Sequence, residues 1–254
     1  MLRRDKELIT LPLAGLVLAL IVGGITLGLV AATGGFNDGA EEGLGGLHYL
    51  LFAVGGIAIA AITQFFAGAV VAGAIERMNG GDPTVGSAIG GASRRLPALL
   101  GWGAMDWTVG TVLRTIREEF GLIGRILAGL LDFAWAAVSF LVLPVIIVEG
   151  LGPVAALRRS TEMLRQTWGE NVLAQFGFGI IGIVAAIPGI ILGVALISVL
   201  PALGIAVLVA WVVGIICVMS ALTSVFKAAL YQYATSGQTD PVFGNDVADA
   251  FRVR

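Results

Sequence analysis

The side chains that build disulfide frameworks and metal centres are almost missing from this sequence. Among 254 residues there is one cysteine, Cys217, and one histidine, His48. A lone cysteine cannot close an intrachain disulfide, and a lone histidine excludes a multi-histidine metal site within one chain. We therefore expect neither a metal site nor a bound cofactor.

Charged residues are also scarce. Asp, Glu, Lys and Arg make up 13% of the chain, about half the share found in soluble domains. The formal net charge of −2 is too small to favour a nucleic-acid partner. Motifs of soluble enzymes are missing too: there is no nucleophile elbow or Walker loop, and the glycine-rich segment 80–83 lacks a following lysine. We expect a protein that is not an enzyme.

Long apolar runs fill the sequence instead. A membrane-spanning helix needs about 20 predominantly apolar residues, and the mean hydropathy of the chain is +0.96. Five runs reach that length: 11–32, 47–75, 126–148, 172–200 and 203–222. A weaker run at 96–116 contains Asp106 and is either a sixth span or an interfacial segment. The sequence predicts an all-α polytopic transmembrane helix bundle of about six spans, with residues 1–254 forming a single membrane domain.

Positive charges are distributed unevenly between the runs. Lys and Arg of short loops concentrate on the cytoplasmic side of a membrane. Counted over alternate segments, only Arg114, Arg117 and Arg125 lie on one side. Twelve lie on the other: Arg3, Arg4, Lys6, Arg77, Arg94, Arg95, Arg158, Arg159, Arg165, Lys227, Arg252 and Arg254. This bias predicts six spans with both termini in the cytoplasm.

Two cytoplasmic segments are long enough to form helices of their own. In 153–168, Pro153 occupies a favoured first helical position. An apolar stripe at helical spacing follows: Val154, Leu157, Thr161, Leu164 and Trp168. A basic amphipathic helix of this kind is typical of the membrane interface, and 83–95 repeats the pattern more weakly. Because such an element precedes each pair of spans, three parallel repeat units are possible, 1–78, 79–150 and 151–235; chance similarity of basic flanks is the alternative.

Two aspartates within the spans form a candidate intramembrane proton or ion site. Asp106 and Asp132 each lie 13 residues from Glu119, where the third and fourth spans turn, so their carboxyl groups reach similar depth. If the two face each other, one keeps its proton because like charges repel. Alternatively, each is structural and binds an arginine, a backbone group or water. Gln64 and Gln175 are expected to supply hydrogen bonds between helices.

Small residues recur four apart along the spans, a spacing that lets helices approach closely. The pairs are Gly24 with Gly28, Gly68 with Ala72, and Gly189 with Gly193. They suit packing within the bundle, and some can serve oligomerisation.

One segment carries a family resemblance. Residues 144–160 read Pro-Val-Ile-Ile-Val-Glu-Gly-Leu-Gly-Pro-Val-Ala-Ala-Leu-Arg-Arg-Ser, and 164–169 read Leu-Arg-Gln-Thr-Trp-Gly. This pattern resembles a family of prokaryotic six-span membrane proteins known as a domain of unknown function, and residues 4–13 are similar to that family's approach to its first span. The resemblance implies the fold and the cytoplasmic (inner) membrane of a prokaryote. It implies no activity, substrate or catalytic residue.

The same segment predicts a rigid cytoplasmic corner motif. Its members are Pro144, Glu149, Gly150, Pro153, Arg158, Arg159 and Trp168. Pro144 can bend the end of the fourth span, Glu149 can pair with Arg158 or Arg159, and Gly150 turns the chain before the next helix. A structural role is favoured, with a ligand site as the alternative.

The functional expectation follows from these features. We expect a non-enzymatic integral membrane protein, a scaffold or accessory subunit of a membrane assembly. Its partners would be the lipid bilayer and a second copy or another membrane protein. The alternative is a transporter or channel for a proton-coupled or lipid-like substrate that uses Asp106 and Asp132, with a kink at Pro188.

Overall fold

A computed structural model describes residues 7–36, 45–167, 176–198 and 200–236, and this part of the chain is all-helical, as predicted. The helices are α1 (Glu7–Ala32), α2 (Gly46–Met78), α3 (Val85–Ser93), α4 (Leu96–Glu119), α5 (Gly121–Val138), α6 (Val142–Glu149), α7 (Pro153–Thr167), α8 (Phe176–Ile197) and α9 (Pro201–Ser236).

Four segments in the described ranges are long and apolar enough to cross a membrane. They are Leu8–Ala32, Gly46–Met78, Ile123–Glu149 and Pro201–Thr235, and Gly182–Ile197 is a shorter apolar helix. Such segments indicate a membrane protein. The residues of the weak run form α4, which does not reach the same apolarity. The count of six spans, like the repeat units, stays a prediction.

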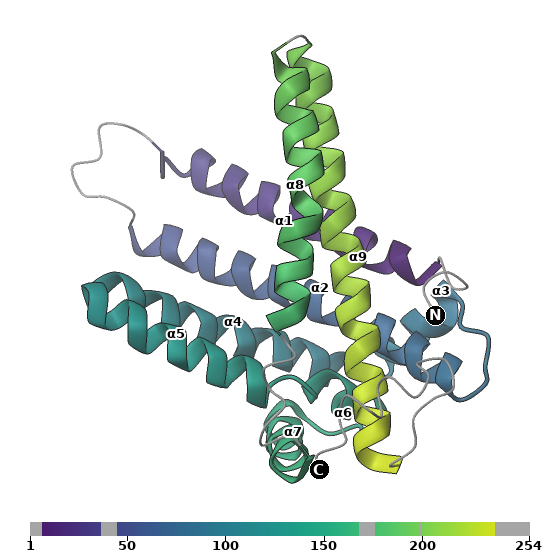
Figure 1. The fold of residues 1–254 in the computed structure, drawn as a ribbon. Helices are drawn as coiled ribbons and strands as arrows, with labels where there is room; N and C mark the ends of the chain where they lie inside the picture. The colour runs from purple at the N-terminus through teal and green to yellow at the C-terminus, as the bar shows by residue number, and fades with distance from the viewer. Residues whose placement is uncertain (1–6, 37–44, 168–175, 199, 237–254) are drawn as a thin grey trace.

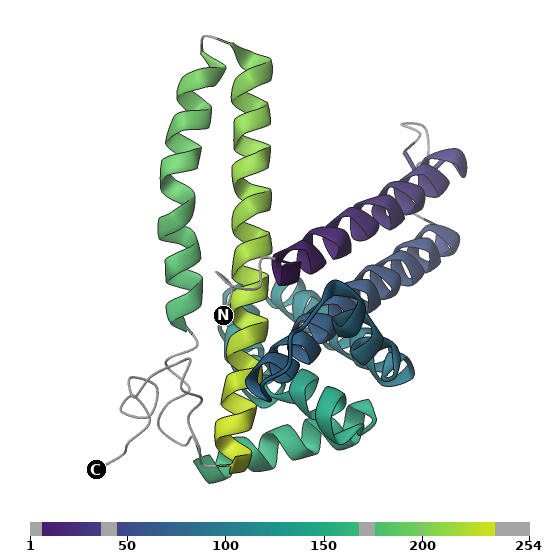
Figure 2. The same ribbon diagram turned by 90° about the vertical axis from the view of Figure 1, so that its right-hand side faces the viewer.

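The helices form three hairpins. Helices α1 and α2 make the first, α4 and α5 the second, and α8 and α9 the third (Figure 1). The first two lie side by side because α2 packs against α4. At that crossing a Cβ at Gly103 would lie 2.7 Å from the Cα of Ala61, so only glycine allows the two backbones to approach so closely. The third hairpin crosses the other two steeply and projects away from them (Figure 2).

The protein core surrounds the short helix α6. Its residues Val142 to Ile146 are at most 4% exposed, and Pro144 is fully buried in the first turn of α6. Three other segments pack against α6: the C-terminal part of α2, the C-terminal half of α9 and helix α7. Large apolar side chains on the distant parts of the hairpins are exposed, which is expected where lipid is the solvent.

The predicted fourth span is interrupted. Residues 139–141 form a turn between α5 and α6, so Pro144 lies in the first turn of a new helix instead of bending the end of a continuous one. The turn is held by Ser160 of α7, which is fully buried. Its hydroxyl donates to the carbonyl of Val138 (2.6 Å) and accepts from the N–H of Leu141 (3.1 Å). These two backbone groups have left the helical ladder and would otherwise lack partners.

Helices form close to the positions predicted for the two interfacial segments, and their place at a membrane interface stays a prediction. Helix α7 begins at Pro153 as expected, but its buried face is Ala156, Ser160 and Met163, offset from the predicted stripe, and Val154 is 56% exposed. Helix α3 is capped by Thr84, whose hydroxyl accepts from the N–H of Ser87 at 3.0 Å.

Candidate functional site

Asp106 joins three helices through hydrogen bonds. From α4 its carboxylate accepts one hydrogen bond from Nε2 of Gln64 in α2 (2.9 Å) and another from Nε1 of Trp135 in α5 (2.8 Å). The expectation that Gln64 bonds between helices is confirmed, whereas Gln175 lies outside the described residues. Both carboxylate oxygens of Asp106 therefore have hydrogen-bond donors within the bundle.

Lys227 of α9 lies near this hydrogen-bonded group. Its ammonium lies 5.2 Å from the centre of the Phe140 ring, in position for a cation–π interaction. Asp106 is the acidic group that acts electrostatically on it. A lysine inside an apolar helix is costly unless a negative charge is close, and Asp106 supplies one here.

Asp132 has a different partner. It forms an ion pair with Arg117 across the α4–α5 hairpin, and both side chains are nearly half exposed, at 42% and 47%. The structure therefore does not bring Asp106 and Asp132 together as a carboxylate pair. Among the described residues, no cluster of three or more His, Cys, Asp or Glu side chains is placed to hold a metal ion.

The corner motif is built around Glu149. Its Oε1 accepts hydrogen bonds from Nε of Arg159 (3.2 Å) and from the hydroxyl of Tyr231 in α9 (3.0 Å). Of the two arginines considered, Arg159 pairs with Glu149, whereas Arg158 is exposed. Trp168, the last member of the motif, lies outside the described residues.

Gly150 completes the corner. Its φ of +70° is a left-handed conformation that favours glycine, and it ends α6. A Cβ at this position would lie 2.5 Å from Nη1 of Arg95, so a side chain would also displace that guanidinium. Arg95 instead donates from Nε to the carbonyl of Ile147 at 3.4 Å, near the C-terminus of α6, where positive charge is favoured.

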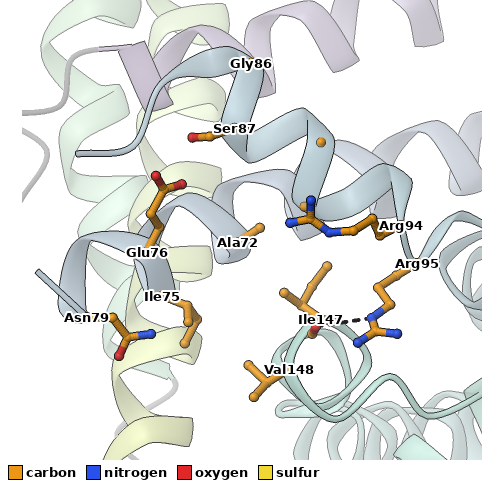
Figure 3. A pocket seen from close by; sticks show the side chains of 12 residues that line it. Ala72, Ile75, Glu76, Asn79, Gly86, Ser87, Arg94, Arg95, Ile147 and Val148 are labelled. Carbon is orange, nitrogen blue, oxygen red and sulfur yellow. Dashed lines mark hydrogen bonds between the residues drawn. The ribbon is translucent and has the colours of Figure 1, made fainter. Parts of the chain in front are cut away.

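A cavity of about 630 Å³, with both polar and apolar lining, lies beside this corner, where α2 ends, α4 begins and α6 ends. Figure 3 shows Arg94 and Arg95 on one side of it and Glu76 and Asn79 of α2 on the other. The glycine-rich helix α3 forms a further wall, and Ile147 closes the cavity from α6. We refer to this space as the arginine pocket.

A second cavity, of about 580 Å³, lies between α2, α6, α8 and α9. We refer to it as the lysine cavity. Its polar lining comes from Gln64 and from one stripe of α9, namely Ser220, Thr223, Ser224 and Lys227, while Ile183, Ile215, Ile216 and Met219 line its apolar part. The stripe residues recur three and four positions apart, which places them on one helix face.

Neither cavity could be predicted from the sequence. Lys227 counted there as one of twelve cytoplasmic charges, although the polar stripe from Ser220 to Lys227 was a visible signal in an otherwise apolar helix. Trp135 and Tyr231 gave no signal, because aromatic residues are common in spans and only the fold brings these two to Asp106 and Glu149.

Comparison with known proteins places the chain in a family. No curated protein and no solved structure matches it. One family model matches residues 48–241, a range that begins in α2, extends past α9 and includes Asp106 and both cavities. This match agrees with the resemblance seen in the sequence and covers well over half of the chain. The chain therefore belongs to the DUF6159 family, a family of unknown function.

Proposed function

We propose that this protein is a non-enzymatic, multi-pass scaffold or accessory subunit that assembles with a second copy of itself in the cytoplasmic membrane of a prokaryote. The uneven distribution of Lys and Arg favours cytoplasmic termini. The observation that carries the proposal is an open small-residue face on α1. A Cβ added at Gly24 or Gly28 would meet nothing within 4 Å among the described residues.

The other small-residue pairs are already used within the chain. A Cβ at Gly68 would contact Leu99 of α4 at 3.1 Å, and glycines 189 and 193 face Trp211 and Leu208 of α9. Gly24 and Gly28 of α1 thus differ from the other two pairs, because no described helix packs against them. Large apolar side chains flank it, with Leu20 at 65% and Ile25 at 57% exposure. Glycines four apart in an apolar helix are a common dimer contact in membranes.

The polar residues of the bundle also suit a structural role. The carboxylate of Asp106 is engaged by Gln64 and Trp135, and that of Asp132 by Arg117. Intramembrane groups bonded in this way connect helices. Both carboxylates therefore have donors within the described bundle, which supports a structural role for them.

The test is the Gly24→Leu/Gly28→Leu double variant, with native mass measured in mild detergent and in lipid nanodiscs. We expect a dimer in the wild type and a dimer dissociation constant raised about tenfold or more in the variant, since bulky side chains separate the helix backbones. Gly129→Leu on α5 is the control, because its Cβ also enters open space. A monomeric wild type would contradict the proposal, as would an unchanged dimer in the variant.

A second candidate function is transport of a proton-coupled or lipid-like substrate, and the lysine cavity favours it. Threonines elsewhere in the bundle donate to the carbonyl four residues earlier, as Thr26, Thr63 and Thr111 do. Within the described residues, the hydroxyls of Ser220, Thr223 and Ser224 have no such bond. They and Lys227 are therefore available to a polar group in the cavity.

Reconstitution tests this second role. If the protein moves an anionic amphiphile, Lys227→Met should reduce the transfer of a fluorescent anionic lipid between leaflets of proteoliposomes about tenfold, because the cavity loses its cation. Arg114→Gln, which removes one exposed positive charge from α4, should leave the rate unchanged. A wild-type rate equal to that of empty vesicles would count against transport.

A further inference from the structure

The arginine pocket contains opposite charges that do not pair. Arg94 lies at the end of α3 and Glu76 near the end of α2, and both line the same space. Neither forms an ion pair with a described residue, although Arg77 nearby pairs with Asp82 at 2.6 Å. Two opposite charges that line one pocket without touching can each bind the oppositely charged part of a zwitterionic ligand placed between them.

The other polar side chains of the pocket differ in whether they already have hydrogen-bond partners within the described chain. Ser87 is occupied, because its Oγ accepts from the N–H of Thr84 and donates to that residue's carbonyl. Arg95 is partly occupied by the end of α6. The side-chain amide of Asn79 has no hydrogen bond within the described chain. The free groups are thus one guanidinium on one side, and one carboxylate with a neighbouring amide on the other.

The place of the pocket in the fold indicates where a ligand would come from. It lies at the ends of α2 and α6 and the start of α4, and so at the level where apolar helices leave the hydrocarbon core. Ala72, Ile75, Ile147 and Val148 give it an apolar side. Its volume of about 630 Å³ falls within the range typical of small-ligand sites. Basic pockets between helices at this level bind lipid head groups.

We propose that the arginine pocket binds a zwitterionic head group, one that joins an anionic phosphate or carboxylate to a primary ammonium. The anion lies at the guanidinium of Arg94, supported by Arg95, and the ammonium lies at the carboxylate of Glu76, beside Asn79. Phosphatidylethanolamine in the adjacent leaflet carries this chemistry, and so does soluble phosphoethanolamine. The inference goes beyond assembly and transport, since it requires binding alone.

Lipid titration monitored by native mass spectrometry, in a non-ionic detergent, tests the assignment. The wild type should bind phosphatidylethanolamine about tenfold more tightly than phosphatidylglycerol, which offers a phosphate but no ammonium. Arg94→Gln should weaken both lipids about tenfold. Glu76→Gln should weaken only phosphatidylethanolamine, so the preference between the two lipids disappears. Arg114→Gln and Glu118→Gln remove matching exposed charges from the distant end of α4 and should change neither value.

A variant that blocks the pocket sterically tests the proposal even if the charge variants fail to fold. Gly90 lines the pocket, and a Cβ there would meet nothing within 4 Å. The Cβ of a leucine at Gly90 therefore meets no clash, and the rest of its side chain should occupy pocket space; the change also replaces glycine in a helix by a better helix former. We expect loss of phosphatidylethanolamine binding with an unchanged or raised melting temperature. Gly110→Leu, at an equally open position of α4, should keep full binding.

A separate arm distinguishes the two sources of the head group. Phosphoethanolamine added to lipid-depleted protein should bind weakly if a membrane lipid is the ligand, because the apolar side of the pocket stays unfilled. Tight binding of phosphoethanolamine that is also lost in Glu76→Gln would support the zwitterion and assign it to a soluble molecule. Equal affinity of the wild type for the two lipids would overturn the proposal. Charge variants that behave like their controls would overturn it as well.

Discussion

Replacing Asp106 with asparagine should destabilise the protein by about 2–4 kcal/mol. The carboxylate accepts hydrogen bonds from Gln64 and Trp135 and offsets the charge of Lys227. The asparagine amide has one oxygen and so can accept from only one of the two donors, Gln64 or Trp135. Its NH₂ group then faces the N–H of the other. It also leaves Lys227 without its acidic neighbour. A melting curve of the purified protein in detergent measures the shift.

The sign of this shift separates the structural and proton-site interpretations of Asp106. A protonated carboxyl held for proton transfer would be replaced by asparagine at little cost, or with a small gain in stability. Asp132→Asn is the control, because Asp132 and Arg117 are nearly half exposed and such a pair contributes about 1 kcal/mol or less. A melting temperature of Asp106→Asn at or above the wild-type value would contradict the structural role.

Ser160→Ala should have a comparable effect, a loss of about 2–4 kcal/mol in the free energy of unfolding. The hydroxyl is the partner of two backbone groups at the break between α5 and α6, Val138 C=O and Leu141 N–H. Alanine leaves both without a bond in a fully buried position. Thermal unfolding in detergent, followed by circular dichroism, reports the change.

The neighbouring threonine provides the control for Ser160. Thr161 also carries a hydroxyl on α7, but it donates to the carbonyl of Leu157 within its own helix. That carbonyl keeps a helical partner when the hydroxyl is removed. Thr161→Ala should therefore lower stability by about 1 kcal/mol or less. Equal losses in the two variants would show that the α5–α6 break does not depend on Ser160.

Much of the fold could be predicted because local signals were strong. The runs 11–32 and 47–75 became α1 and α2 within a few residues at each end, since continuous apolar sequence gives a helix in lipid. Pro153 marked the start of α7 correctly. The break at residues 139–141 could not be predicted, because it lies inside an apolar run and is stabilised by a serine 19 residues away. From the sequence, a serine in a basic helix is expected on the solvent-exposed face, so Ser160 gave no sign of its buried role.

The candidate sites were only partly predictable, and for a related reason. An aspartate in a span is conspicuous, so Asp106 and Asp132 were found. Their partners were not, because Gln64 is 42 residues from Asp106 and Trp135 is 29. The symmetric positions of the two aspartates about Glu119 suggested a pair. Similar depth does not fix the direction in which a side chain points around its helix, and here Arg117 reaches Asp132 instead.

The length of α9 makes the arrangement of the hairpins depend on the thickness of the membrane. Its 36 residues measure about 54 Å, whereas a hydrocarbon core is about 30 Å thick. A helix that exceeds its bilayer must tilt or extend into water. Among the described residues, the packing of the third hairpin against α1, α2 and α6 is supplied mainly by α9, so the hairpin can change its tilt about that junction. Bilayer thickness then acts on the angle between the third hairpin and the other two.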